Sequence, residues 1–180
     1  LGFSPKQTMQ LAQRLYEGVE IDGETVGLIT YMRTDGVTID PGAITAIRTM
    51  VARDYAQKYV APFIREYKSK AKNAQEAHEA IQPTDFGKEK AGSGDHAKLY
   101  DLIYKRALAS QMASARMERT TVDLADGTGQ HILRATGQVV KFPGFLALYE
   151  EGLDDKDDEN GALLPAMDKG DAPAKKAVEM

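Results

Sequence analysis

The sequence predicts an α+β fold in which a mostly helical domain, residues 1–118, is followed by a β-rich domain, residues 119–180. Apolar residues recur at helical spacing along most segments before Thr120, whereas after it apolar and polar residues alternate between glycine-containing turns. The charge balance changes at the same place. Residues 1–119 hold 17 Lys and Arg against 15 Asp and Glu, and residues 120–180 hold 6 against 12.

Three helices are predicted in the first domain from their end signals. Ser4 followed by Pro5 begins the first helix, which Gly18 ends. The second begins at Asp40 with Pro41 in its first turn and runs to Pro62, and the third runs from Asp95 to about Met117.

Shorter elements fill the intervals between these helices. Residues 19–27 have the pattern of a hairpin that turns at Asp22-Gly23, and residues 28–32, "LITYM", continue as a strand. A helix-prone segment, "NAQEAHEAIQ", ends before Pro83. Residues 150–160 form an acidic loop, and residues 162–180 resemble another pair of strands.

Composition excludes several classes of protein. No apolar run approaches the ~18 residues of a membrane span, and the start "LGFSPKQT" lacks the layout of a signal peptide and an initiator Met. We therefore expect a piece of a longer chain that has no membrane partner. Zero cysteines exclude disulfides and thiolate zinc sites, which fits the cytoplasm. A net charge of −4 means that any polyanion site is local.

The stretch "ITYMRTDG" places possible reactive groups close together. On a strand, Tyr31, Arg33 and Asp35 share one face while Thr30 points the other way. A free tyrosine has a pKa of about 10 and is a poor nucleophile at neutral pH, but a guanidinium in reach stabilises a phenolate and binds phosphate. The alternative is a packing tyrosine beside a solvated arginine, which is the commoner case.

A second candidate lies in "NAQEAHEAIQPTD". On a helix, Gln75, His78 and Glu79 lie on one side, where a histidine can move protons or contact a phosphate. The alternative is a polar helix face with no task. One histidine without a second ligand at metal spacing is not a metal site.

Taken together and in order, "LGFSPKQTMQLAQRLYEG", "LITYMRTDG" and "AQEAHEAIQPTDF" resemble segments of the bacterial type IA DNA topoisomerases. The flanking segments favour the topoisomerase I branch over topoisomerase III and reverse gyrase. The resemblance implies a multidomain toroid, with residues 1–118 as the helical domain that carries the active-site tyrosine and residues 119–180 as part of the β-rich arch.

The resemblance also implies an activity. Tyr31 matches the tyrosine that cleaves and reseals single-stranded DNA through a 5′-phosphotyrosine, which relaxes negatively supercoiled DNA without ATP. Arg33 and His78 match catalytic residues, and Thr30, Arg33, Asp35, Gln75 and His78 are the expected DNA contacts. Mg²⁺ is expected on a Toprim domain that this chain lacks, so the chain alone is expected to be inactive. The remaining domains of a parent enzyme, cytoplasmic and associated with the nucleoid, are the implied partners.

Two positions depart from the pattern. Gly36 stands where many members have serine, and Gln82 replaces an arginine, which removes a positive charge near the DNA. Two other functions stay open: a non-catalytic module that binds single-stranded DNA by stacking on Tyr31, and a purely structural helical domain.

Overall fold

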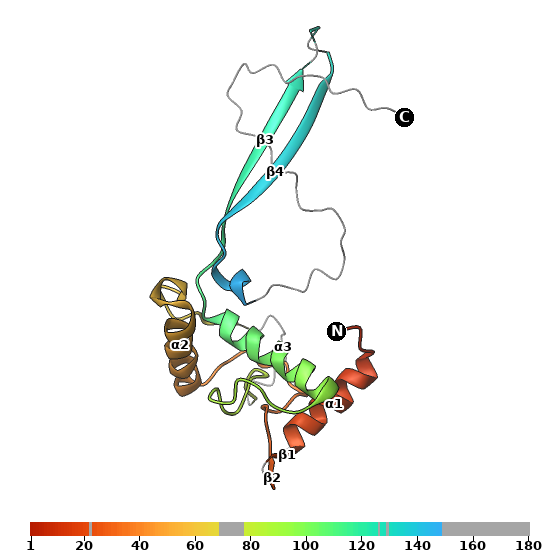
Figure 1. Cartoon of the computed structure of the whole chain (residues 1–180), viewed down its shortest axis with the longest axis vertical. Coiled ribbons are helices and arrows are strands. Elements are labelled where there is room, and N and C mark those ends of the chain that lie inside the picture. Colours follow the sequence, from red (N-terminus) through yellow and green to blue (C-terminus); the bar gives the residue numbers. More distant parts are fainter. Residues whose placement is uncertain (22, 69–77, 126, 129, 149–180) are drawn as a thin grey trace. The chain divides into compact units, whose positions relative to one another are not determined.

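The computed structural model describes residues 1–21, 23–68, 78–125, 127–128 and 130–148 of the 180-residue chain. These residues form two compact units (Figure 1). The first comprises Leu1–Ser114 together with residues 143–148, and the second comprises Ala115–Phe142. The mixture of helices and small antiparallel sheets confirms the α+β class. The assignment of residues 1–118 and 119–180 to two domains of a toroid stays a prediction.

Helix α1 (Pro5–Glu17) begins and ends at the residues that the sequence predicts. The Ser4 Oγ accepts the N–H of Gln7 at 3.2 Å, and the chain leaves the helix at Gly18, whose φ of 123° is open to glycine. Strands β1 (Val19–Ile21) and β2 (Glu24–Val26) then pair antiparallel, which confirms the predicted hairpin.

Helix α2 (Pro41–Tyr55) is capped by Asp40. The Asp40 carboxylate accepts the N–H groups of Gly42 and Ala43 at 2.7 and 3.2 Å, which satisfies donors that the first helical turn leaves open. Its apolar face carries Ile44, Ile47, Met50 and Val51 into the core. A 3-10 turn, η1 (Gln57–Tyr59), follows.

Helix α3 (Gly94–Ser110) differs from the prediction at both ends. Ser93 takes the N-cap position, so Asp95 lies in the first turn, where a carboxylate suits the helix dipole. The helix ends at Ser110 instead of about Met117. Met112 forms a β-bridge with Val60, and these backbone bonds replace further helical ones.

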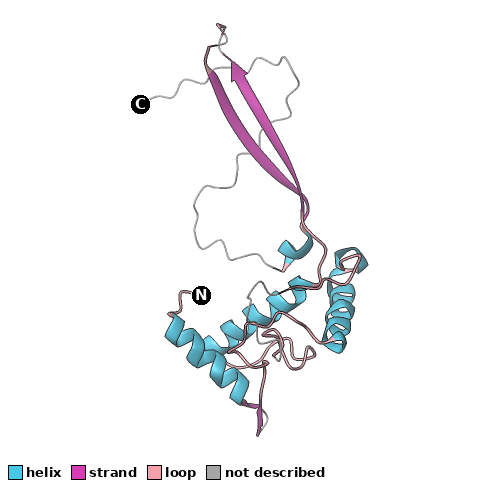
Figure 2. Ribbon diagram, turned by 180° about the vertical axis from the view of Figure 1, so that it is seen from behind, coloured by secondary structure: helices cyan, strands magenta, loops and turns pink. Residues whose placement is uncertain are grey.

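Helix α3 contacts both α1 and α2 in the first unit, and Figures 1 and 2 show the three helices around one core. Two of its tyrosines are fully packed there. The hydroxyls of Tyr100 and Tyr104 donate to the main-chain oxygens of Lys88 and Phe86 at 2.6 and 3.0 Å. Burial raises the pKa of Tyr100 to about 12 and raises that of Tyr104 as well, so both stay neutral and structural.

The second unit is an antiparallel pair of strands, β3 (Arg116–Ala125) and β4 (Ile132–Phe142), drawn in magenta in Figure 2. The pair confirms the predicted change to β structure, although β3 begins before Thr120. Asp123 lies opposite Arg134, and their side chains form an ion pair at 2.7 Å. The predicted acidic loop and the last predicted strands lie outside the described residues.

Within the described residues, no helix is long and apolar enough to cross a membrane.

Candidate active site

Two segments far apart in sequence run side by side and carry the candidate residues. The N–H of Thr30 donates to the oxygen of Gln82 at 2.9 Å, and the N–H of Thr84 donates to the oxygen of Leu28 at 3.1 Å. Further along, the N–H of Ala80 donates to the oxygen of Thr38 at 2.9 Å. These bonds fix residues 28–38 against residues 78–84.

The predicted strand over residues 28–32 is wrong, because only Ile29 forms a bridge, with Pro83. Proline has no N–H with which to continue a ladder. The predicted helix is also wrong over residues 78–82, whose backbone groups bond across to residues 30–38 instead of along the chain. Gln75, the earlier part of that helix, lies outside the described residues.

Tyr31 and His78 are brought together by this pairing. Their ring centroids lie 5.3 Å apart with the planes at 38°, and both side chains are half-buried. The ring of Tyr16, on the last turn of α1, meets the Tyr31 ring edge to face at 5.3 Å and 68°. The Tyr31 ring is therefore held by two neighbours.

Thr30 locks the two segments to each other. Its Oγ1 donates to the oxygen of Ala80 at 2.8 Å and accepts the N–H of Gln82 at 3.0 Å. The single hydroxyl donor is thereby used within the protein. The predicted contact of Thr30 with DNA stays a prediction, and the structure gives this residue a positioning role beside Tyr31.

Arg33 is exposed and directed towards α1. One of its Nη2 protons is donated to the Oε1 of Gln13 over a long 3.4 Å. A guanidinium carries five N–H groups, so one weak bond leaves donors for a phosphate. Asp35, two residues on, is exposed. The predicted roles of Arg33 and Asp35 in binding DNA are untested by this geometry.

Gly36 makes a close backbone approach that the sequence did not reveal. A Cβ atom at this position would overlap the main-chain oxygen of His78 and would lie 2.9 Å from its carbonyl carbon. Only glycine allows this spacing, since real Cβ contacts are longer. The glycine at residue 36, where many family members have serine, therefore leaves room for the main chain of His78.

Gln82 lies inside the protein, with 3% of its surface exposed. Its Nε2 donates to the Oε2 of Glu79 at 2.9 Å, and its Oε1 is buried without a partner among the described residues. The buried amide of Gln82 therefore pairs with the Glu79 carboxylate. The predicted loss of DNA affinity at residue 82 stays a prediction.

The sequence interpretation missed Gln13 and Tyr16 as neighbours of the site. Their i, i+3 spacing places both on one face of α1, and both contact the segment that contains Tyr31 and Arg33. The available sequence signal was a tyrosine in the last turn of the predicted helix, three residues after Gln13.

The site does not fit a metal ion as it stands. No group of three or more His, Cys, Asp or Glu side chains is placed to hold one anywhere in the part of the chain that the structure describes. The Mg²⁺ that the family resemblance implies therefore has no ligand set among these residues.

Comparison with known proteins agrees with the resemblance in the motifs. The sequence model of the family described as DNA topoisomerase matches residues 1–180. "DNA topoisomerase 1" of Zymomonas mobilis is 61% identical over 183 residues, which cover 99% of this chain and 14% of that protein. The Rickettsia bellii protein of the same name is 49% identical over 173 residues, covering 93% and 22%.

A solved structure is similar as well. Full-length topoisomerase I from Thermotoga maritima matches with a TM-score of 0.73 and 32% identity, covering 93% of this chain and 26% of that one. This chain thus spans less than a quarter of the length of the two curated relatives named above. Because the family match covers every residue, the chain belongs to the bacterial type IA DNA topoisomerase family.

Proposed function

We propose that this chain is the tyrosine-bearing part of an enzyme that cleaves and reseals single-stranded DNA and so relaxes negative supercoils. The observation that carries the proposal is the contact between the Tyr31 and His78 rings, which joins two family motifs from distant parts of the sequence. Because DNA is the proposed substrate, the location that we propose for the parent enzyme is the cytoplasm, in association with the nucleoid.

In the proposed reaction the phenol oxygen of Tyr31 attacks the phosphorus of one phosphodiester. The bond from phosphorus to the 3′ oxygen breaks as the bond to tyrosine forms, the phenol loses its proton, and the 3′ oxygen gains one. One phosphodiester replaces another, so the reverse reaction reseals the strand without ATP.

The neighbouring residues take roles that their chemistry allows. His78, in contact with the Tyr31 ring, accepts or donates a proton or binds the phosphate. The Arg33 guanidinium binds a non-bridging oxygen as charge builds on it. Loss of one such charged donor lowers the cleavage rate by about 10²- to 10³-fold. Acidic residues of another part of the parent enzyme would bind Mg²⁺, which would stabilise negative charge on the phosphate.

The competing function, a binding module in which Tyr31 stacks on a base, fits the geometry less well. The rings of Tyr16 and His78 already pack against Tyr31, which reduces the ring surface open to a base. A structural domain without a site would give the same packing, so the hydroxyl has to be tested directly.

The test is Tyr31→Phe in the parent enzyme, with a single-stranded oligonucleotide labelled at its 3′ end. We expect the unchanged enzyme to become covalently labelled on rapid denaturation, because the 5′ phosphate of the labelled fragment stays on tyrosine. Tyr31→Phe should lose the labelled adduct and still bind the oligonucleotide. Tyr16→Phe is the matched control and should keep the adduct, whereas an adduct on the Tyr31→Phe protein would refute the proposal.

A further inference from the structure

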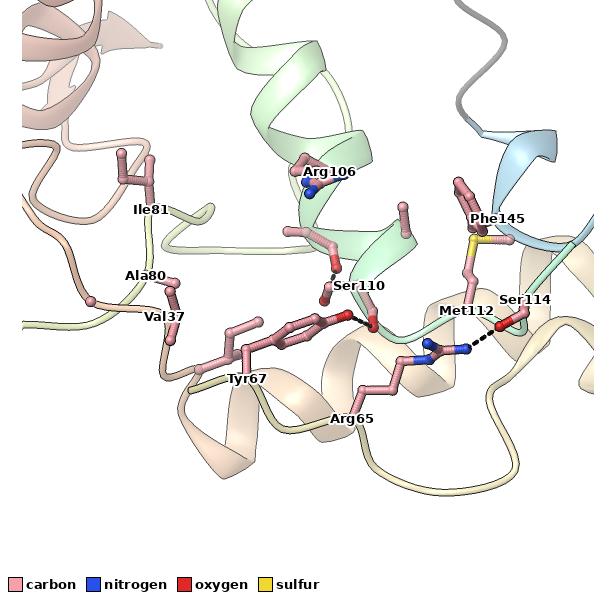
Figure 3. A pocket seen from close by; sticks show the side chains of 14 residues that line it. Val37, Arg65, Tyr67, Ala80, Ile81, Arg106, Ser110, Met112, Ser114 and Phe145 are labelled. Carbon is pink, nitrogen blue, oxygen red and sulfur yellow. Dashed lines mark hydrogen bonds between the residues drawn. The ribbon is translucent and has the colours of Figure 1, made fainter. Parts of the chain in front are cut away.

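A pocket of about 340 Å³ lies in the first unit, next to the loops that carry the candidate site (Figure 3). Val37 and Ala80 line one side, and they belong to the same paired segments as Tyr31 and His78. The last turns of α3 line the opposite side, and the segment of Arg65 and Tyr67 closes the base. We call it the arginine pocket after two of its lining residues, Arg65 and Arg106.

Arg65 is held rigidly at the edge of this pocket. The buried side chain of Gln111 accepts the N–H of Arg65 at 3.1 Å and donates to its main-chain oxygen at 2.9 Å. The Arg65 Nη2 donates to the Oγ of Ser114 at 2.8 Å. A guanidinium that is fixed beforehand loses little conformational entropy when it binds an anion.

Only one of the five N–H donors of this guanidinium is bonded to a described residue, and one of the others is buried. The Nε of Arg65 is buried and has no hydrogen-bond partner among the described residues. A buried donor without an acceptor is costly and calls for an acceptor such as a water molecule or an ion.

The charge of the pocket defines the class of ligand. Arg65 and Arg106 both line it, and no Asp or Glu is among its lining residues in the described part of the chain. Glu66, the nearest carboxylate in sequence, lines a separate groove beside the pocket. A cavity that is lined by two arginines suits an anion with several oxygens. The positive charge is local, because the chain as a whole has a net charge of −4.

An aromatic surface lies beside these charges. The Tyr67 hydroxyl donates to the main-chain oxygen of Ser110 at 2.8 Å, and the side chain is still 47% exposed. Phe145 lines the same pocket. A ring that is tied at its hydroxyl and open elsewhere is suited to stack against a base.

We propose that the arginine pocket binds one nucleotide of the cleaved single strand, with its phosphate on Arg65 and its base against Tyr67. The volume is at the small end of ligand pockets, which suits a single nucleotide unit. The inference rests on the proposed function, because it assigns the pocket to the same DNA strand. The wall formed by residues 36, 37, 39, 80 and 81 belongs to the segments that carry Tyr31 and His78, so the bound nucleotide is a near neighbour of the scissile phosphate.

The test compares Arg65→Ala with Arg53→Ala in the Tyr31→Phe form of the parent enzyme. Arg53 is an exposed arginine on α2 that is paired with Asp54 and Glu89 and lines none of the pocket. The measurement is fluorescence anisotropy with a single-stranded oligonucleotide at several salt concentrations. We expect Arg65→Ala to weaken binding about tenfold or more and to lower the slope of log K against log salt by about 0.7, with both unchanged in Arg53→Ala.

A scan with one abasic nucleotide at each position tests for the base. The Tyr31→Phe enzyme should lose affinity at one position in particular, and adding Tyr67→Ala should remove that sensitivity. Arg65→Lys covers the case in which Arg65→Ala unfolds the protein, since it keeps the charge but loses the Nε donor, and it should bind several-fold more weakly. If Arg65→Lys and Arg65→Ala both match Arg53→Ala, or if no position is sensitive, the pocket holds no nucleotide. The labelled adduct of the unmodified enzyme is independent of these results, so the proposed function can stand while this inference fails.

Discussion

Tyr31 differs from the buried tyrosines of the same unit in what its hydroxyl contacts. Tyr100 and Tyr104 donate their hydroxyl protons to main-chain oxygens, and burial raises the pKa of each. Within the described residues the Tyr31 hydroxyl makes no such bond, although its ring is held on two sides. A fixed ring with an unbonded hydroxyl is compatible with the nucleophile that we propose, which would still need a base or a cation to activate it.

At the residue scale, Gly36 gives a sharp prediction. Gly36→Ala introduces a Cβ that overlaps the His78 oxygen, so the main chain at residue 36 or at His78 has to shift. We expect the labelled adduct to form about 10- to 100-fold more slowly, because small displacements in a site are costly, with DNA affinity nearly unchanged.

The matched control is Gly127→Ala, at a position where a Cβ would meet nothing within 4 Å. Rapid-quench measurement of the adduct separates its formation from DNA binding. Equal cleavage rates for Gly36→Ala and Gly127→Ala would show that the close approach has no bearing on the chemistry.

At the element scale, the sequence predicted what local signals determine. Ser4 and Asp40 mark helix starts through side-chain bonds to the next few N–H groups, and Asp22-Gly23 marks a hairpin, so these elements were correct. The segment around Tyr31 was predicted wrongly, since its backbone partners are about 50 residues away and end at a proline. No local sequence pattern predicts such a pairing.

The residues of the candidate site divide in the same way, into those that sequence motifs identify and those that depend on packing between distant segments. Family motifs identified Tyr31 and His78, and the structure brings their rings together. Tyr16 and the arginine pocket depend on how α1 and α3 pack against distant segments, which hydrophobic periodicity alone does not specify.

The role of Thr30 in holding the two segments together can be tested by measuring the stability of the protein. Thr30→Val keeps the shape of the side chain but removes both hydrogen bonds to residues 80 and 82, which leaves a buried N–H and C=O without partners. We expect the free energy of unfolding in urea to fall by about 1–3 kcal/mol. Thr30→Ser keeps the hydroxyl and should lose much less, and equal losses in the two variants would rule out this role of the hydroxyl.

At the scale of the whole molecule, the described part of the second unit is a single pair of strands. Among the described residues β3 and β4 pair only with each other, and Ile132, Leu133 and Val140 are largely exposed. A two-stranded ladder is marginally stable in water, and open strand edges favour further pairing. We expect further segments of this chain or of the parent enzyme to cover this hairpin.

The 180-residue chain should therefore lack the activity proposed for the parent enzyme. We expect no relaxation of negatively supercoiled plasmid when the purified chain is incubated with Mg²⁺ and the products are separated on an agarose gel. The parent enzyme under the same conditions is the positive control, and its Tyr31→Phe form is the negative one. Relaxation by the chain alone would mean that it carries a complete site, including its own metal ligands.

The hairpin of β3 and β4 interrupts the first unit, and the chain leaves and re-enters that unit at neighbouring points. The N–H of Phe145 donates to the oxygen of Ala113 at 3.0 Å, and Gly144 fits there because a Cβ would lie only 2.5 Å from that oxygen. An insertion whose two ends lie close together can be lengthened, shortened or exchanged without a change in the path of the chain through the core. Residues 113 and 145 therefore mark where evolution, or a protein engineer, could replace the whole hairpin while leaving the tyrosine site intact.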